Sequence, residues 1–346
     1  MKSTRTLLRK ICGVSLLMSM AALLALSADK AAAGQVATIS DLGTLSGGIF
    51  SVGTGVNGRD EVIGYALTAN QQYHAFLYHD GVMNDLGTLP GGNYSIAAGI
   101  NDRGQVAGFA TVASGNLHAF LYESGVMTDL GTLPGGTVSV GKAINDSGQV
   151  AGYAYPANSD FRAFLYDHGV MNALGTLPGG GFSAAIGIND PGQVVGYATT
   201  ASGQYHAFLY DHGVMTDLGT LPGGGNSFAN SINARGQVVG QSQTANGTTH
   251  AFLYDQGVLT DLGTLPGGSN SSASSINALG QVVGSSQTAN GDYHAFLYDH
   301  GVMMDLGTLP GGSDSFATDI NNEGKVSGLA HTAGGAGHAV VWTTTH

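Results

Sequence analysis

The chain has 346 residues, 57 of them glycine, with 11 basic and 23 acidic residues and a formal net charge of −12 at pH 7. A negative net charge with few, scattered basic residues argues against a protein that binds nucleic acid or an anionic membrane surface. The single cysteine, Cys12, rules out an intramolecular disulfide and a metal site built from several cysteines.

The first 33 residues have the order of a secretory signal peptide. Basic residues within the first ten positions precede the apolar run ICGVSLLMSMAALLALS (11–27), and Ala31–Ala33 offers a small-residue cleavage site. An uncleaved membrane anchor is the alternative, but the run is shorter than the ~20 residues that span a bilayer. We therefore expect export, cleavage between Ser27 and Ala33, and a secreted mature chain, residues 34–346, that is not inserted in a membrane.

From residue 34 onward, one sequence unit recurs every 44 residues without insertion or deletion. The His-Ala-Phe tripeptide, or its variant, starts at His74, His118, Arg162, His206, His250, His294 and His338. The run Asp-Leu-Gly-Thr-Leu, or its variant, starts at Asp41, Asp85, Asp129, Ala173, Asp217, Asp261 and Asp305. An Asn preceded by Val or Ile stands at Asn57, Asn101, Asn145, Asn189, Asn233, Asn277 and Asn321. A fixed period of this length predicts a repeat architecture.

Each unit predicts four short strands separated by turn residues. In the unit that follows Leu177, the expected strands cover residues 183–189, 193–199, 206–211 and 214–221. Apolar residues fall on both faces of these strands, which indicates small sheets covered on both sides. Seven units of four antiparallel strands predict an all-β fold, a seven-bladed β-propeller over residues 34–346.

The two ends of the repeat array complement each other. The first Asp-Leu-Gly-Thr-Leu run has no His-Ala-Phe strand before it, and the last such strand, HAVVW (338–342), has no Asp-Leu-Gly-Thr-Leu run after it. Pairing of residues 36–45 with residues 338–342 would complete the seventh blade, whereas an open β-solenoid would need atypical capping units. Closure makes the Asn-containing strand innermost and agrees with a column of small residues there: Gly53, Ala97, Gly141, Ala185, Ala229, Ala273 and Ala317.

The recurring His-Ala-Phe, DLGTLPGG and IND-x-GQVVG elements resemble the HAF repeat of bacterial extracellular proteins, over the whole mature chain. The resemblance implies export and a repeated β architecture, and it brings no established activity and no catalytic residues. The chain departs from the pattern at Arg162 (for His), Ala173 (for Asp), Ser46 (for Pro) and Val340 (for Phe).

The repeated His, Asp and Asn residues raise the question of a metal site. A zinc ion needs ligands within ~2 Å of one point, whereas equivalent residues of seven blades lie around a ring. We therefore expect each His to bond to backbone at the start of its strand. A calcium ion needs six to eight oxygens, and each unit offers only one or two acidic groups. The Asn-Asp-x-Gly segments are expected to close turns with their own side chains, and neither a metal nor another cofactor is predicted.

Catalysis requires different groups in different roles at one place. The charged residues that break the repeat are scattered along the array and form no recognisable nucleophile and base: Arg59, Lys142, Arg162, Glu323 and Lys325. We expect no catalytic residues and no enzyme activity. A lyase or hydrolase with a site at the centre of the ring remains the alternative.

Two columns vary between units, and both are expected on one face of the ring. One lies in the turn between strands two and three, and the other lies in the crossover between blades. Aromatic residues beside Asn, Ser and Gly suit contacts with sugars or protein surfaces. The ligand-binding candidates are Tyr73, Phe161, Tyr205, Tyr293, Phe50, Tyr94 and Phe182. The alternative is that these rings only cover neighbouring blades.

The predicted function is therefore that of an exported, monomeric binding module for a glycan or protein partner at the cell surface. A structural role in an envelope or matrix is the alternative.

Overall fold

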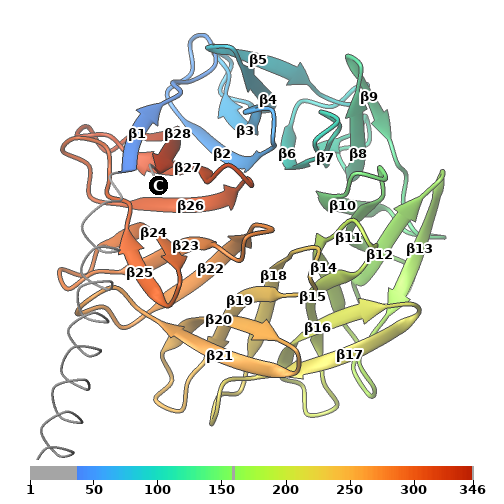
Figure 1. Cartoon of the computed structure of the whole chain (residues 1–346). Coiled ribbons are helices and arrows are strands. Elements are labelled where there is room, and N and C mark those ends of the chain that lie inside the picture. Colours follow the sequence, from blue (N-terminus) through green and yellow to red (C-terminus); the bar gives the residue numbers. More distant parts are fainter. Residues whose placement is uncertain (1–36, 158–159, 345–346) are drawn as a thin grey trace, which may run out of the picture. The chain divides into compact units, whose positions relative to one another are not determined.

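A computed structural model describes residues 37–157 and 160–344, so the expected signal peptide lies outside the described residues. The described part contains 28 β-strands and no helix, and therefore no helix that is long and apolar enough to cross a membrane. The strands form seven four-stranded antiparallel sheets. Within the compact unit Ile39–Trp342 these sheets stand as blades around a common axis (Figure 1). The prediction of a seven-bladed β-propeller is confirmed.

The blades follow one another along the chain. Blades 1 to 4 contain, in order, β2 (Ser51–Val56), β3 (Val62–Leu67), β4 (Tyr73–His79), β5 (Val82–Gly87); β6 (Ser95–Ile100), β7 (Val106–Thr111), β8 (Leu117–Glu123), β9 (Val126–Asp129); β10 (Val138–Ile144), β11 (Val150–Tyr155), β12 (Arg162–Asp167), β13 (Val170–Gly175); and β14 (Ser183–Ile188), β15 (Val194–Thr199), β16 (Tyr205–Asp211), β17 (Val214–Gly219). Blades 5 to 7 contain β18 (Ser227–Ile232), β19 (Val238–Gln243), β20 (Thr249–Asp255), β21 (Val258–Gly263); β22 (Ser271–Ile276), β23 (Val282–Gln287), β24 (Tyr293–Asp299), β25 (Val302–Asp305); and β26 (Ser315–Ile320), β27 (Lys325–His331), β28 (Gly337–Thr344), β1 (Ala37–Asp41).

The strand order within a blade agrees with the expected one. The Asn-containing strand is innermost and the Asp-Leu-Gly strand is outermost, as in β2-β3-β4-β5. In all seven blades the innermost strand has a register shift, for example between Gly53 and Gly55. Such a β-bulge re-aims a side chain. Here it turns the extra residue of each inner strand toward the axis.

The core lies between blades. The phenylalanine of each His-Ala-Phe tripeptide is fully buried, and one cluster joins Ile63 of blade 1 with Val106 and Phe120 of blade 2. The glycine of the second strand makes room for this ring. A Cβ atom on Gly64 would lie 1.8 Å from the Val52 carbonyl oxygen and 2.8 Å from the Phe76 ring. Close packing therefore accounts for the glycine that recurs in every second strand.

The seventh blade reaches the same packing with different residues. Val340 stands where the other blades have phenylalanine, and Trp342 stands where they have tyrosine. The Trp342 ring lies 2.8 Å from the Cβ position of Gly328, the glycine equivalent to Gly64. Trp342 is fully buried, and its Nε1 is the one buried side-chain nitrogen or oxygen in the described part of the chain that lacks a hydrogen-bond partner.

The prediction that each repeated histidine bonds to backbone was wrong. In the structure these histidines pair with a carboxylate instead. His74 Nδ1 lies 2.8 Å from Asp85 Oδ2, which belongs to the outermost strand of the same blade. The equivalent pairs are His118–Asp129, His206–Asp217, His250–Asp261, His294–Asp305 and His338–Asp41. The prediction missed that a cross-strand carboxylate was within reach. Blade 3 replaces both partners at once, by Arg162 and Ala173, and Arg162 instead donates to the carbonyl oxygens of Phe161 and Gly181.

A buried serine at the start of each inner strand joins neighbouring blades. Ser95 Oγ of blade 2 accepts from Ala75 N at 2.8 Å and donates to Gly87 O at 2.5 Å, and both of these groups belong to blade 1. Ala75 and Gly87 are partners at the register shift between β4 and β5, and the serine bonds to both strands there. The same two bonds recur at Ser51, Ser139, Ser183, Ser227, Ser271 and Ser315.

The predicted closure of the ring is confirmed. β1 is the outermost strand of the blade that begins with β26, and Leu42 N donates to Ala339 O at 2.9 Å. The strands have different bounds from the expected ones, because β1 ends at Asp41 and β28 extends to Thr344. An ion pair reinforces the junction between blades 7 and 1, where Lys325 Nζ lies 2.6 Å from Asp60 Oδ2.

Candidate functional site

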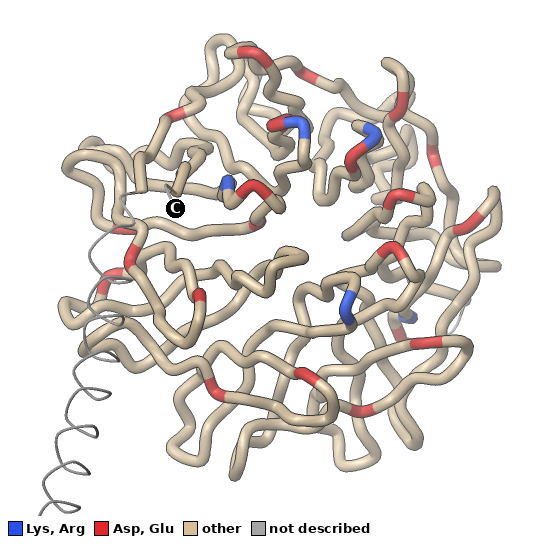
Figure 2. The backbone as a smooth tube through the Cα atoms, viewed as in Figure 1, with Lys and Arg blue, Asp and Glu red and all other residues tan. Residues whose placement is uncertain are grey.

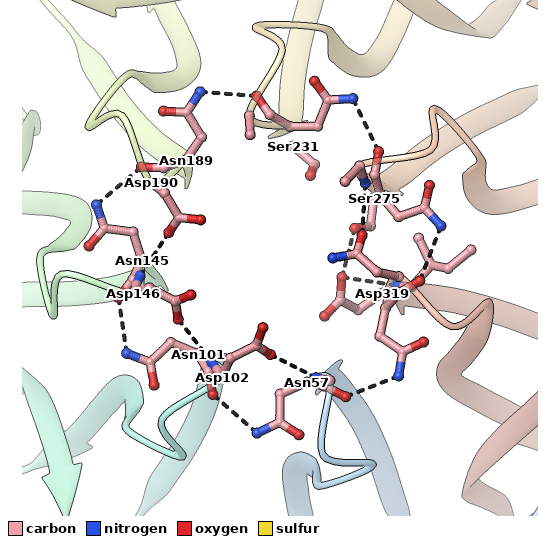
Figure 3. Close-up of a pocket in the computed structure, with 18 of the residues that line it drawn as sticks. Asn57, Asn101, Asp102, Asn145, Asp146, Asn189, Asp190, Ser231, Ser275 and Asp319 are labelled. Atoms are coloured by element: carbon pink, nitrogen blue, oxygen red, sulfur yellow. Dashed lines mark hydrogen bonds between the residues drawn. The ribbon is translucent and has the colours of Figure 1, made fainter.

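The central opening on one face is encircled by the seven repeated asparagines. Each donates from Nδ2 to the backbone oxygen of the equivalent Asn in the next blade, at 3.0–3.1 Å, and Asn321 closes the circle on Asn57. Figure 3 shows most of these side chains around the opening. We call this set the Asn ring. It also confirms the predicted turn role, because Asn57 Oδ1 accepts from the backbone nitrogens of Arg59 and Glu61 at 3.0 Å.

Acidic side chains stand on one side of this opening, and they are used by the fold. Asp102 Oδ1 accepts from Gly58 N at 2.7 Å, Asp146 Oδ1 accepts from Asp102 N, and Asp190 Oδ1 accepts from Asp146 N (Figure 3). Within the described residues, no group of three or more His, Cys, Asp or Glu side chains is arranged to hold a metal ion. The opening is therefore lined by groups that hold adjacent turns together.

A larger cavity, about 660 Å³, continues along the axis toward the opposite face. All seven blades contribute to its wall, mainly through the bulged residues of the inner strands: Thr54, Ala98, Lys142, Ile186, Asn230, Ser274 and Thr318. Tyr65 and Phe109 of the second strands also line it. Unlike the Asn ring, this column is not repeated: only blades 1 and 7 share a residue type, threonine, and each other blade has its own. The central cavity therefore has chemically distinct sides.

Several polar groups of this wall are already engaged between blades. Thr54 Oγ1 donates to Ala97 O, Thr318 Oγ1 donates to Gly53 O, and Asn230 Nδ2 donates to Ala273 O, at 2.8–2.9 Å. In contrast, no hydrogen bond or ion pair joins Lys142 Nζ or Ser274 Oγ to any described residue. Burial lowers the pKa of Lys142, and no carboxylate offsets this effect.

Asp319, on the inner strand of blade 7, lies where the central cavity adjoins the Asn-ring opening. Oδ1 accepts from Ser275 Oγ at 2.6 Å and from Ile320 N at 2.9 Å, and Oδ2 accepts from Val56 N at 3.0 Å. Burial raises the pKa of Asp319, and these hydrogen bonds only partly offset that rise. The two charged residues of the cavity therefore have separate surroundings and do not form an ion pair.

The face opposite the Asn ring carries the turns between strands two and three and the crossovers between blades. We call it the aromatic face, because the seven candidate rings lie on it. Phe50, Tyr73 and Tyr94 form one cluster, with the Tyr73 centroid 6.1 Å from that of Phe50 and 6.2 Å from that of Tyr94. Tyr65 packs against this cluster from the cavity wall, with its centroid 5.6 Å from that of Tyr73.

A second cluster covers the joints of blades 3, 4 and 5. Phe182 lies 6.2 Å from Phe161 and 5.8 Å from Tyr205, and Tyr205 stacks on Phe228 at 5.8 Å. Tyr293 stands apart from both clusters and stacks on Phe316 at 6.1 Å. Of the seven candidates only Tyr205 is exposed, at 37%, and the other six are half-buried. The contacts agree with the alternative that most of these rings cover neighbouring blades.

The crossover column joins blades in two chemically different ways. Tyr94 and Phe182 do so by ring contacts with Tyr73 and Phe161 of the preceding blades, whereas the Phe50 ring contacts Tyr73 of its own blade. Later in the chain the same position carries oxygen acceptors, and Asn226 Oδ1, Asn270 Oδ1 and Asp314 Oδ1 accept from the backbone nitrogens of Tyr205, Thr249 and Tyr293 at 2.9–3.0 Å. The aromatic face is therefore aromatic over blades 1 to 4 and richer in amide and hydroxyl groups over blades 5 to 7.

Sequence reasoning missed a third aromatic column, in the second strand. Its members are Tyr65, Phe109, Tyr153 and Tyr197 in blades 1 to 4, followed by Gln241, Ser285 and Leu329. Burial raises the pKa of Tyr65, Tyr153 and Tyr197. The signal was present, because the column varies between units like the two that were chosen, but its position inside a strand made it look like core.

Charge does not mark out the site. Basic residues are few and are spread over five of the seven blades, whereas acidic residues are distributed around the ring (Figure 2). Lys142, which was noted only as a break in the repeat, is the basic residue that lines the central cavity among the described residues.

No protein-family model matches the sequence, and no curated protein matches it. Several solved structures resemble the fold at low sequence identity. A puromycin-hydrolysing peptidase from Mycobacterium tuberculosis matches with a TM-score of 0.56 and 12% identity, over 89% of this chain and 54% of the peptidase. A structure described as the extracellular domain of a one-component system from B. thetaiotaomicron matches with a TM-score of 0.53 and 12% identity, over 88% of this chain and 39% of that one.

TolB from Acinetobacter baumannii matches with a TM-score of 0.46 and 13% identity, over 82% of this chain and 76% of TolB. The chain thus spans about half of the peptidase and less than half of the extracellular domain. The likeness to the peptidase and to the extracellular domain shows a shared fold, and at these identities it carries neither an activity nor a ligand from one protein to another.

Proposed function

We propose that this chain is an exported, non-enzymatic binding module of the HAF-repeat type, which holds a glycan or a protein partner on the aromatic face, at the mouth of the central cavity. One observation carries the proposal. The side chains of the cavity wall and of the turns on this face differ between units, whereas the Asn ring, the His–Asp pairs and the serine bonds are repeated and internally satisfied.

The chemistry of the face supports a polar ligand with some apolar surface. Rings such as Tyr205 and Tyr65 offer flat apolar area, and neighbouring amide and hydroxyl groups offer hydrogen bonds. Sugars present both kinds of surface, and so do protein loops. The cavity volume lies within the ~300–1,000 Å³ typical of small-ligand sites.

The same geometry gives little support to a central catalytic site. A general base needs a nucleophile or an acidic proton within hydrogen-bond reach. Both oxygens of Asp319 accept hydrogen bonds that hold blades 6, 7 and 1 together, and Lys142 has no described partner. The cavity charges therefore do not form a nucleophile–base pair.

Binding of the purified protein to a glycan array and to envelope polysaccharide tests this proposal. In the variant Tyr205→Thr/Tyr293→Thr both tyrosines become threonine, the residue that blade 5 has at the equivalent position, Thr249. We therefore expect this variant to fold. Loss of two ring contacts should weaken binding about tenfold or more.

The control is His212→Ser/His300→Ser on the opposite face, where Ser124 is the precedent and both histidine side chains are more than nine-tenths exposed. Equal binding by the two variants would contradict the assignment of the face. Absence of any glycan or protein ligand would favour the structural role.

Export is tested by sequencing the N-terminus of protein recovered outside the cytoplasm. We expect the mature chain to begin between residues 28 and 34. An intact Met1 in that fraction would contradict signal cleavage.

A further inference from the structure

We propose that the central cavity is a site for an acidic saccharide, with Lys142 Nζ as the anchor for a sugar carboxylate. This inference rests on the proposed binding function and deepens it, because it names the ligand class and the residue that selects it.

The first step of the argument is the unpaired ammonium group. Lys142 is the bulged residue of β10, between Gly141 and Ala143, and it lines the central cavity. Two other basic residues near the axis have carboxylate partners, Glu61 for Arg59 and Asp60 for Lys325. Lys142 has none among the described residues. The Lys142 side chain is half-buried, and a cation withdrawn from water without a counter-charge is costly unless a ligand supplies that charge.

The second step is the chemistry of the remaining wall. Ser274 Oγ has no hydrogen bond to a described residue, and Asn230 uses Nδ2 in a bond to Ala273 O, which leaves Oδ1 without a described donor. These groups match sugar hydroxyls, which both donate and accept. Tyr65 and Phe109 add aromatic surface to the same wall. Aromatic rings pack well against the apolar faces of sugar rings.

The third step is electrostatic selection. Residues 34–346 contain six basic and 22 acidic residues, so a densely charged polyanion would be repelled. A single ammonium group fits one carboxylate, whereas a phosphate dianion is usually held by several donors. Asp319 does not block the cavity, because its oxygens are engaged at the end that adjoins the Asn ring. A weakly charged uronate-containing saccharide therefore fits the cavity better than nucleic acid or a phosphorylated ligand.

Calorimetric titration tests the proposal with oligomers of glucuronate, galacturonate and mannuronate, each beside its carboxyl-reduced, neutral counterpart. The protein should bind at least one acidic oligomer about tenfold or more tightly than its reduced form, as expected for one charge-assisted contact. Lys142→Ala should remove that difference and leave the affinity for the neutral form unchanged. Lys142→Arg should keep most of it.

The variants have matched precedents in the chain. Ala98 occupies the same bulge in blade 2, so Lys142→Ala should keep the fold, which its melting temperature checks. Arg235→Ala removes the same charge from an exposed turn near the Asn ring and should change nothing.

The outcomes separate this inference from the proposed function. Glycan binding that depends on Tyr205 but not on Lys142 would overturn the inference and leave the proposed function standing. Binding of short peptides that is lost on amidation of their C-terminus, without saccharide binding, would assign Lys142 to a peptide carboxylate and overturn the saccharide. No binding of any probe by the native protein would overturn both.

Discussion

At the scale of single residues, the repeated polar side chains serve the blade joints. The asparagines show this most completely. Asn145 donates to Asn189 O and Gln149 Oε1, and its Oδ1 accepts from the backbone nitrogens of Ser147 and Gln149. One buried side chain thus satisfies a turn and links two blades, which explains why every unit repeats it.

Replacement of Asn145 by Ala should therefore be costly. It leaves a buried carbonyl oxygen without its side-chain donor and two turn nitrogens without an acceptor. The bond to Gln149 Oε1 is lost as well, so at ~1 kcal/mol for each of the four lost bonds the free energy of unfolding should fall by about 4 kcal/mol. Urea denaturation measures this, with the exposed Asn84→Ala as a control that should change stability by less than ~0.5 kcal/mol. A similar midpoint for the two variants would mean that the Asn ring adds no stability.

Asp319, in contrast to Asn145, is expected to lower the stability of the folded protein at neutral pH, and this effect should depend on pH. Burial raises its pKa in the folded protein, so the folded state binds this proton more tightly than the unfolded state does. Its ionised form therefore lowers stability above the folded-state pKa, and this penalty fades as the pH falls toward the ordinary range of Asp.

The variant Asp319→Ser places serine where blades 5 and 6 naturally have it, as Ser231 and Ser275. We expect a higher melting temperature than that of the native protein at pH 7, and a gain that shrinks or reverses near pH 3. Calorimetry at both pH values checks this prediction. A gain that is constant with pH would show that ionisation of Asp319 is not its cause.

At the scale of elements, some features can be predicted from one repeated position of the unit, whereas others require two repeated positions to be considered together. A single column is enough for turns and strand order, so the Asn turn role and the small inner-strand residues could be predicted. The His–Asp pair needs two columns 11 residues apart, and its signal was the joint change to Arg162 and Ala173 in one unit. The cavity could not be predicted, because the bulge that turns Lys142 toward the axis leaves no mark in the spacing of the repeat.

Blade 7 contains a second such joint change. Val340 leaves space that the Trp342 ring fills beside Gly328, so each residue suits only the other. Val340→Phe alone should crowd that ring and cost ~1–3 kcal/mol. Trp342→Tyr alone should leave a cavity and cost at least ~2 kcal/mol.

The double variant Val340→Phe/Trp342→Tyr restores the residues of the other blades and removes the unpaired Trp342 Nε1. It should regain most of the native stability, with a coupling energy of more than ~1 kcal/mol in a double-mutant cycle followed by urea denaturation. Additive losses would show that the two positions pack independently.

At the scale of the whole molecule, stability depends on joining the two ends of the chain. Asp41 and His338 form the same pair as the other blades make, but they are separated by 297 residues along the chain instead of 11. Leu45 enters the core between blades 7 and 1, beside Val56 and Ala339. The first strand therefore completes both an edge and a core.

Deletion of residues 34–45 from the mature chain should uncouple this junction. It removes the partner of Ala339 O, the carboxylate of the His338 pair and the Leu45 side chain, and it leaves the edge of β28 unpaired. An unpaired edge strand pairs readily with other chains. We expect a lower melting temperature and concentration-dependent association in light scattering, whereas removal of residues 1–33 alone should cause neither. A peptide covering residues 34–48 should restore the monomer when it is added in trans. A truncated protein that stays monomeric with an unchanged melting temperature would contradict this account, because the ring would then be held together without the strand that closes it.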